Sequence, residues 1–198
     1  MTLAVVDSGV ANLTSVMAAL KRLNVEAEVT SDAQKICAAS RVILPGVGAA
    51  SAAMAQLNAK NLSDVIRALT QPVLGICLGM QLLYERSEES GGCQGLGIIK
   101  GIVQQLPAKK DMPIPHMGWN QLSLRVQNHP LLHGIKDGSF VYFVHSFAAP
   151  VSDATLASCD YSATFTAIAE YKNFFGCQFH PERSGAIGNQ ILKNFLEL

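Results

Sequence analysis

Two short patterns in the sequence combine residue types that could carry out nucleophilic catalysis on a carbonyl group. In the first, residues 75–79 (Gly-Ile-Cys-Leu-Gly), a short apolar segment ends at Cys77 and a helical pattern starts directly after it. A sharp strand-to-helix turn of this kind holds a nucleophile at the carboxyl end of a sheet, and the start of a helix stabilises a thiolate. The backbone amide of Leu78 would then face the reacting carbonyl as an oxyanion donor. A free cysteine is more often a small buried hydrophobic residue, so this interpretation needs a base elsewhere in the chain.

The second pattern, His180-Pro181-Glu182, could supply that base. A residue before proline is held in an extended conformation, and in an extended chain residues i and i+2 point to the same side. The Glu182 carboxylate can therefore lie beside the His180 ring and orient it, which gives a triad with cysteine in place of serine and glutamate in place of aspartate. On its own the tripeptide also fits an ordinary surface histidine near a surface glutamate.

The other four histidines are competing candidates for the base. His129 and His133 lie in a turn-like segment, residues 128–134, and are expected to be solvated. His116 lies in the segment Pro-His-Met-Gly-Trp-Asn (115–120), and His145 lies in Val-His-Ser (144–146). Neither has a carboxylate two residues further on, as His180 does.

The elements that must position these residues alternate in the first half of the chain. Apolar runs predict strands at 3–6, 26–30, 42–44 and 73–76, with the third stopped by Pro45-Gly46. Helical patterns predict helices at 13–23 and 78–89, and one or two helices at 49–69, where residues 58–61 weaken the middle. In the second half, strands are expected at 98–106, 121–126, 139–147, 154–159, 165–170 and 174–179, before a final helix at 185–196. This order predicts an α/β fold with a central, mostly parallel sheet and an antiparallel extension in the C-terminal half, forming one domain over residues 1–198.

Composition excludes several classes of function. The chain has 198 residues, 49% of them hydrophobic, and its 15 basic and 15 acidic side chains cancel. No basic run exceeds Lys109-Lys110, so we expect no nucleic-acid partner. The longest uncharged stretch, 42–59, is interrupted by Pro45 and several polar residues, and the N-terminus lacks a signal-peptide pattern, so we expect no membrane association. The five cysteines form no Cys-x-x-Cys pair, and no metal-site spacing or phosphate loop occurs, which predicts a cytoplasmic protein without metal or cofactor.

The combination of residues 75–81 (Gly-Ile-Cys-Leu-Gly-Met-Gln) with His180-Pro181-Glu182 resembles the class I, triad-type glutamine amidotransferases. The resemblance covers the whole chain and implies a flavodoxin-like α/β fold and hydrolysis of glutamine to glutamate and ammonia. It implies that Cys77 attacks the side-chain amide to form a γ-glutamyl thioester. His180 would protonate the leaving ammonia and then activate water, while Glu182 orients His180.

Four further segments are similar to one branch of this family, the glutaminases of histidine biosynthesis: residues 45–48 (Pro-Gly-Val-Gly), 115–120, 142–147 (Tyr-Phe-Val-His-Ser-Phe) and 180–185 (His-Pro-Glu-Arg-Ser-Gly). The resemblance implies that the amides of Val47 and Leu78 form the oxyanion site, in a loop that glycines at 46 and 48 allow to reorient. Implied substrate contacts are Gly46, Gly48, Gln81, Glu89 and the backbone of Ser146 and Phe147. Glu89 would bind the α-ammonium group of glutamine, although the neighbouring Glu88 could be confused with it.

In this branch, ammonia passes to a (βα)₈-barrel cyclase subunit, so the resemblance also implies a heterodimer. The residues implied to face the barrel are Asn12, Trp119, Tyr142, Arg183 and Lys193. Trp119 is the only tryptophan in the chain, and it could equally be a core residue. One departure from the pattern is Phe147, where many relatives have tyrosine.

Three alternatives stay open on the sequence alone. The chain could be the glutaminase of another synthase, such as one that makes anthranilate or pyridoxal phosphate, although those relatives lack the 115–120 segment. It could hydrolyse γ-glutamyl peptides. It could also be a flavodoxin-like binding module in which Cys77 is merely reactive, although such a module would not need Glu182 beside His180.

Overall fold

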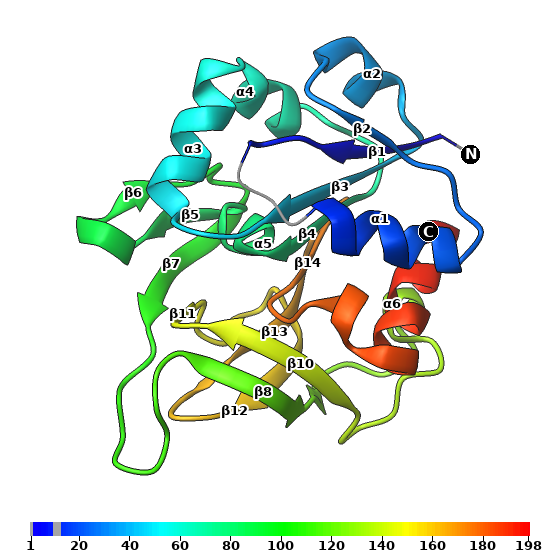
Figure 1. The fold of residues 1–198 in the computed structure, drawn as a ribbon. Helices are drawn as coiled ribbons and strands as arrows, with labels where there is room; N and C mark the ends of the chain where they lie inside the picture. Colours follow the sequence, from blue (N-terminus) through cyan, green and yellow to red (C-terminus); the bar gives the residue numbers. More distant parts are fainter. Residues whose placement is uncertain (1, 10–12) are drawn as a thin grey trace.

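The computed structural model describes residues 2–9 and 13–198, and its centre is an eight-stranded sheet (Figure 1). The strands from β2 to β14 are parallel, and the remaining strands pair antiparallel. The fold class predicted from the sequence is therefore confirmed. In spatial order the strands are β2 (Glu28–Thr30), β1 (Leu3–Val6), β3 (Arg41–Gly46), β4 (Val73–Cys77), β14 (Phe174–Cys177), β13 (Thr164–Tyr171), β12 (Thr155–Asp160) and β9 (Ser123–Leu124).

Helices cover both faces of the parallel strands because alternate strand residues point to opposite sides. Ile43 packs in one apolar cluster with α1 and α6, whereas Val42 and Leu44 pack in another with α2, α3 and α4. Figure 1 shows these two groups of helices on opposite sides of the sheet. The helices are α1 (Leu13–Arg22), α2 (Ala33–Ala38), α3 (Ala50–Ala59), α4 (Leu62–Arg67), α5 (Leu78–Gln81) and α6 (Gly185–Glu197). In the described ranges, none is long and apolar enough to cross a membrane.

Two smaller sheets flank the carboxyl end of the parallel strands. One contains β11 (Phe147–Ala148), β7 (Ile99–Gln105), β5 (Tyr84–Ser87) and β6 (Cys93–Gln94). The other is a two-stranded ribbon of β10 (Phe140–His145) and β8 (His116–Gln121). Three short 3₁₀ turns complete the described elements: η1 (Glu89–Gly91), η2 (Pro130–Leu132) and η3 (Pro181–Arg183).

Several predicted boundaries are wrong, and the predicted helix at 78–89 is the clearest case. The helix ends after one turn because the next carbonyls pair elsewhere: the Leu82 carbonyl accepts from the Leu96 amide at 2.7 Å, and the Leu83 carbonyl accepts from the amides of Ile98 and Ile99. The chain then continues as β5. These partners lie more than ten residues further on, so helical periodicity alone could not reveal them.

Three strand predictions also need correction. β3 does not stop before Pro45-Gly46 but includes both residues, because Gly46 remains in register with Cys77 of β4. The strand predicted at 121–126 is not continuous: β8 ends at Gln121, and the short β9 follows it. The strand predicted at 139–147 is divided at Ser146, where the chain passes from the ribbon to the four-stranded sheet. By contrast, the expected interruption near residues 58–61 is present between α3 and α4.

A close backbone contact holds α6 against η3, the turn that carries Glu182. A Cβ atom added at Gly188 would lie 1.9 Å from the carbonyl oxygen of Pro181. Backbone atoms cannot move aside as a flexible side chain can, so glycine is needed here to let the helix approach.

We therefore expect Gly188→Ala to lower the free energy of unfolding by about 1–3 kcal/mol, because the added methyl forces α6 away from η3. Helix propensity alone predicts the opposite sign, a gain of about 1 kcal/mol. Urea denaturation measures the change. The control is Ala186→Gly on the exposed side of the same helix, which should cost about 1 kcal/mol through propensity alone. A Gly188→Ala variant more stable than the native chain would contradict the contact.

Candidate active site

Cys77 lies at a strained turn between β4 and α5. Its backbone has φ 53° and ψ −111°, a region that residues other than glycine rarely adopt and that costs about 1–3 kcal/mol. The flanking glycines serve packing: a Cβ atom at Gly75 would lie 2.7 Å from the Gly79 carbonyl oxygen, and one at Gly79 would lie 1.8 Å from the Leu44 carbonyl oxygen. The conformational strain thus rests on Cys77 itself. A helix starts directly after Cys77, as expected, but α5 has only four residues instead of the predicted span 78–89.

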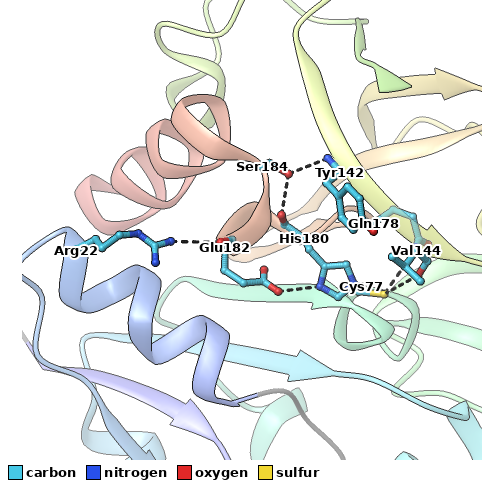
Figure 2. Close-up of polar contacts among 8 residues, drawn as sticks. All are labelled: Arg22, Cys77, Tyr142, Val144, Gln178, His180, Glu182 and Ser184. Carbon is cyan, nitrogen blue, oxygen red and sulfur yellow. Dashed lines mark hydrogen bonds and ion pairs between the residues drawn. The ribbon is translucent and has the colours of Figure 1, made fainter. Parts of the chain in front are cut away.

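His180 and Glu182 lie side by side on η3 and are both buried. Nδ1 of His180 is 2.8 Å from Oε1 of Glu182, and since a carboxylate only accepts, Nδ1 carries a proton. Figure 2 shows the Cys77 sulfur beside the other edge of the same imidazole ring. The second carboxylate oxygen of Glu182 is buried without a hydrogen-bond partner in the described part of the chain.

The electrostatics of this group favour a positive charge on His180. Burial alone would lower the pKa of the imidazole, but its hydrogen bonds to Cys77 and Glu182 and their negative charges raise that pKa to about 10. At neutral pH the ring is therefore an imidazolium that lies between a sulfur atom and a carboxylate. Such a ring can donate a proton to a group that leaves a carbonyl carbon at Cys77.

The backbone of His180 is tied to strand β10. The His180 amide donates to the Tyr142 carbonyl at 3.0 Å, and the Tyr142 amide donates to the Ser184 hydroxyl oxygen at 2.9 Å. The same hydroxyl donates to the His180 carbonyl at 2.7 Å, so Ser184 bridges the two residues (Figure 2). On the opposite side, Arg22 of α1 donates to the Glu182 carbonyl at 3.3 Å.

A cavity of about 280 Å³ opens beside the sulfur. A larger groove of about 930 Å³ lies elsewhere, near η2 and the end of α6, and contains neither Cys77 nor His180. The smaller cavity brings together most of the sequence-predicted site residues, and its lining consists of Val47, Gly48, Cys77, Leu78, Gln81, Glu89, Pro115, Val144, His145, Ser146, Phe147 and His180.

Gly46 is the exception among the predicted cavity residues. It lies inside β3, and a Cβ atom there would lie 2.9 Å from the Gly79 amide nitrogen. Gly46 is therefore glycine for close packing, and the expectation that it supplies loop flexibility is wrong. Gly48 has φ +86° and no atom within 4 Å of an added Cβ, so it alone provides the left-handed conformation in this loop. Val47 between them is 38% exposed.

The structure distinguishes Glu89 from its neighbour. Glu89 lines the cavity, and its Oε2 accepts from the Ala50 amide at 2.6 Å, at the start of α3. Glu88 is exposed and contacts Gln104 instead. The cavity wall thus presents one carboxylate, and it also anchors the helix that follows the 45–48 loop.

Sequence reasoning missed Gln178, which links the cavity to the sulfur. Its side chain is fully buried, with Nε2 3.9 Å from the Cys77 sulfur, and its Oε1 accepts from Nε2 of Gln81 at 3.0 Å. Gln81 Nε2 also donates to the Phe147 carbonyl at 2.8 Å. The available signal was a single amide side chain within the otherwise apolar predicted strand 174–179. Val144, also missed, contributes a carbonyl oxygen 3.8 Å from the sulfur.

The residues expected to face a partner lie on one side of the β8–β10 ribbon and near α6. Trp119 is 55% exposed, which rules out the alternative that it is a core residue, and its ring meets Tyr142 edge to face at 5.9 Å. Met117 and Phe140 are also exposed on these two strands. Arg183 and Lys193 are exposed as well, whereas Asn12 lies outside the described residues.

Comparisons with known proteins agree with this geometry. Residues 4–198 match the family described as glutamine amidotransferase class-I. Solved structures with this fold include PurLQS from Thermotoga maritima (TM-score 0.69, 20% identity, 99% of this chain and 97% of that chain) and the glutaminase domain of CTPS from Trypanosoma brucei (TM-score 0.69, 14% identity, 100% and 94%). The chain belongs to the class I glutamine amidotransferase family, as its two motifs predicted.

Within that family the chain is similar to one kind of subunit. It is 50% identical over 200 residues to imidazole glycerol phosphate synthase subunit HisH of Escherichia coli K12, with 100% of both chains covered. It is 51% identical over 203 residues to the HisH subunit of Shewanella loihica, with 98% of this chain and 89% of the relative covered. Similarity of this extent covers every element that builds the cavity.

We expect Ser184→Ala to lower the free energy of unfolding by about 1–3 kcal/mol, because it leaves the part-buried Tyr142 amide without its acceptor and removes the hydroxyl that donates to the His180 carbonyl. The matched control is Ser162→Ala. Ser162 is equally buried, and its hydroxyl has no hydrogen-bond partner within the described ranges, so its removal should change stability by less than about 0.5 kcal/mol. Urea denaturation compares the two variants. Equal effects would show that the bridge from Tyr142 to His180 contributes nothing.

Proposed function

We propose that the chain is the glutaminase subunit of imidazole glycerol phosphate synthase, a lyase-type complex of histidine biosynthesis, and that it hydrolyses glutamine to glutamate and ammonia in the cytoplasm. The observation that carries the proposal is the buried pair of His180 and Glu182 beside Cys77 at a cavity of about 280 Å³. The full-length similarity to HisH subunits supports the choice of synthase.

In the proposed mechanism, Cys77 is the nucleophile and His180 the acid and base. The sulfur attacks the side-chain amide carbon of glutamine, and the C–N bond breaks as His180 delivers its proton to the leaving ammonia, which leaves a γ-glutamyl thioester. Neutral His180 then takes a proton from water, and the resulting hydroxide attacks the thioester carbonyl and releases glutamate. A pKa raised to about 10 suits the first step, because the ring is charged when the amine leaves. Glu182 holds the ring and stabilises its charge.

The amides of Val47 and Leu78 are the proposed oxyanion donors. One such donor contributes roughly 10²–10³-fold in rate. Leu78 follows the nucleophile in a backbone fixed by close packing, whereas Val47 precedes Gly48, whose backbone has conformational freedom. The two donors therefore differ: the Leu78 amide is permanent and the Val47 amide is adjustable.

The remaining cavity residues suit a free amino acid. The Glu89 carboxylate is the proposed partner of the α-ammonium group, and Gln81, Gly48 and the backbone of Ser146 and Phe147 are the other proposed contacts. A volume of about 280 Å³ lies at the lower end of ligand cavities, which fits glutamine better than a γ-glutamyl peptide.

The exposed side of the β8–β10 ribbon is the proposed contact with a (βα)₈-barrel cyclase subunit. Exposed aromatic residues grouped on one face are typical of interface centres, and the exposed Trp119 and Phe140 form such a group together with the half-buried Tyr142. Arg183 and Lys193 are proposed to lie at its margin, with Asn12 as a further contact. Ammonia released at Cys77 would enter the cyclase across this face.

We expect Cys77→Ala to abolish glutamine hydrolysis while the complex with its cyclase subunit still uses added ammonium, since the thiol serves only amide cleavage. Glutamate release and cyclase product are measured with each nitrogen source. Cys93→Ala is the control, because Cys93 is a second, half-buried thiol in β6, and it should leave both activities unchanged. A glutamine-like electrophile should modify Cys77 and not Cys93 by mass spectrometry. Near-normal glutamine turnover by Cys77→Ala would contradict the assignment.

The partner subunit is proposed to control the rate of glutamine hydrolysis. We expect the chain alone to be a poor glutaminase and the complex carrying a cyclase ligand to be faster by about 10²–10³-fold, the contribution of one oxyanion donor. Such coupling requires an element with two conformations, and the loop at Val47-Gly48 is the proposed one, since Gly48 has φ +86° and open space around it. Glutamate release is measured for the chain alone, with partner, and with partner plus ligand. Gly48→Ala, which restricts only the backbone, should remove most of the activation. Equal turnover in the three native samples would disprove coupling.

A further inference from the structure

The histidines that the proposed mechanism does not use include two buried rings in the wall of the ribbon. His116 of β8 and His145 of β10 are directly opposite in the antiparallel register, and their exposed fractions are 3% and 6%. Nδ1 of His116 lies 3.0 Å from Nε2 of His145. His145 also lines the cavity beside Cys77, so this pair connects the cavity wall to the interior of the ribbon.

Hydrogen-bond partners at the two ends fix the protonation of both rings. Nδ1 of His145 lies 2.9 Å from the Phe147 carbonyl, which can only accept, so that nitrogen carries a hydrogen. The Nε2 of a neutral His145 is then an acceptor, and the facing Nδ1 of His116 must be the donor. Nε2 of His116 is left to accept from the side-chain amide of Asn120, at 3.4 Å.

Asn120 cannot reverse this order. Its amide nitrogen also donates to the Asp160 carbonyl at 2.9 Å, and its side-chain oxygen accepts from the Gln121 amide at 2.8 Å. Asn120, His116, His145 and the Phe147 carbonyl therefore form a line of hydrogen bonds. Every donor in this line points the same way, from Asn120 toward the Phe147 carbonyl. A proton added to either ring would place two donors face to face.

The surroundings agree with two neutral rings. His116 is stacked between Tyr161 and Phe143, with ring centroids 4.0 and 4.9 Å away. Burial lowers the pKa of His116 to about 4. Burial also lowers the pKa of His145 to about 3, with a further contribution from the charge on His180.

The line of hydrogen bonds ends at the Phe147 carbonyl oxygen, which also holds a side chain of the cavity. The Phe147 carbonyl accepts from both His145 and Gln81, so both of its lone pairs are used. The His145 ring thus closes the bend at Ser146, where β10 gives way to β11, and it fixes the backbone from Val144 to Phe147 that lines the cavity. Through the shared carbonyl it also sets the position of the Gln81 amide.

We propose that His116 and His145 act as a pair of positioning residues, which as neutral Nδ1–H imidazoles hold the Val144–Phe147 wall and Gln81 in place for binding the substrate. The inference rests on the proposed glutaminase function. It assigns the pair to binding rather than to the chemical step, because neither ring is placed to exchange a proton with the substrate while both of its nitrogens are engaged.

The first test is independent of activity. Nitrogen NMR of the full chain labelled with ¹⁵N-histidine, near pH 7 and with and without its cyclase subunit, should show both rings as neutral Nδ1–H tautomers. Residue assignments come from His116→Asn and His145→Asn. A cationic ring, or an Nε2–H tautomer at either position, would overturn the proposal.

The second test separates binding from chemistry in the complex. His145→Gln removes the donor at the Nδ1 position, so we expect the KM for glutamine to rise on the order of 10-fold with kcat changed less than about 3-fold. His145→Asn keeps an amide donor near that position and should raise KM less. Exposed His133→Gln is the control and should change neither constant. In a Cys77→Ala background, the dissociation constant for glutamine by calorimetry should rise as KM does.

An unchanged KM, or a loss confined to kcat, in a folded His145→Gln variant would overturn the positioning role. If that variant does not fold, His116→Leu and His116→Asn provide the same contrast at the neighbouring ring. Of these two variants, only His116→Asn keeps a donor toward His145. Absence of glutamate release by the native complex would instead disprove the proposed function. The NMR measurement of the two tautomers would then still test the arrangement proposed for His116 and His145.

Discussion

The geometry of the site depends on a direct contact between the backbones of α5 and β3. Gly79 lies so close to the Leu44 carbonyl that a single methyl group would come within 1.8 Å of the oxygen, and a methyl group at Gly46 would lie 2.9 Å from the Gly79 amide nitrogen. With the start of the helix pressed against the neighbouring strand, the chain cannot relax the turn between β4 and α5. Cys77 therefore keeps φ 53° despite its side chain, and its sulfur stays at the end of the parallel strands. Larger residues at 46, 75 or 79 would move the sulfur before they touched the cavity.

Strand β10 is the second element on which the site depends, because successive residues of this strand contact different parts of it. The Tyr142 backbone binds the His180 amide and the Ser184 hydroxyl, the Val144 carbonyl lies beside the sulfur, and His145 holds the cavity wall. The outer side chains of β10 and of its partner β8 form the exposed aromatic surface, with Trp119 and Tyr142 directly paired. A shift of the ribbon relative to the central sheet would act on the triad and on the wall together. A partner bound to this face and moving the ribbon would thus act on both the triad and the cavity wall.

The sequence allowed the chemistry to be predicted better than the elements that support it. Cys77, His180 and Glu182 could be found because their spacing is local: a turn between glycines, and two side chains separated by one proline. The helix predicted at 78–89 was wrong because the carbonyls that end it pair with residues 96–99, and such a contact leaves no periodic signal. Gly46 was misinterpreted for a related reason, since a glycine needed for packing and a glycine needed for flexibility look alike in sequence. Gln178 was missed because its strand is otherwise apolar, and its role becomes visible only through Gln81 and the sulfur.

The imidazoles of His180 and His145, which both line the cavity, differ in charge state because their partners differ. His180 faces a sulfur and a buried carboxylate, and both favour its cation. His145 faces a carbonyl on one side and a donor on the other, and the charge on His180 disfavours a second cation nearby. Positive charge is thereby confined to the ring that contacts the Cys77 sulfur. The second carboxylate oxygen of Glu182, which has no hydrogen-bond partner among residues 2–9 and 13–198, strengthens this separation, because a buried carboxylate with one hydrogen bond depends on the imidazolium for its stabilisation. In the proposed mechanism the transferred proton is therefore held at His180, because hydrogen bonds occupy both ring nitrogens of His145 and of His116.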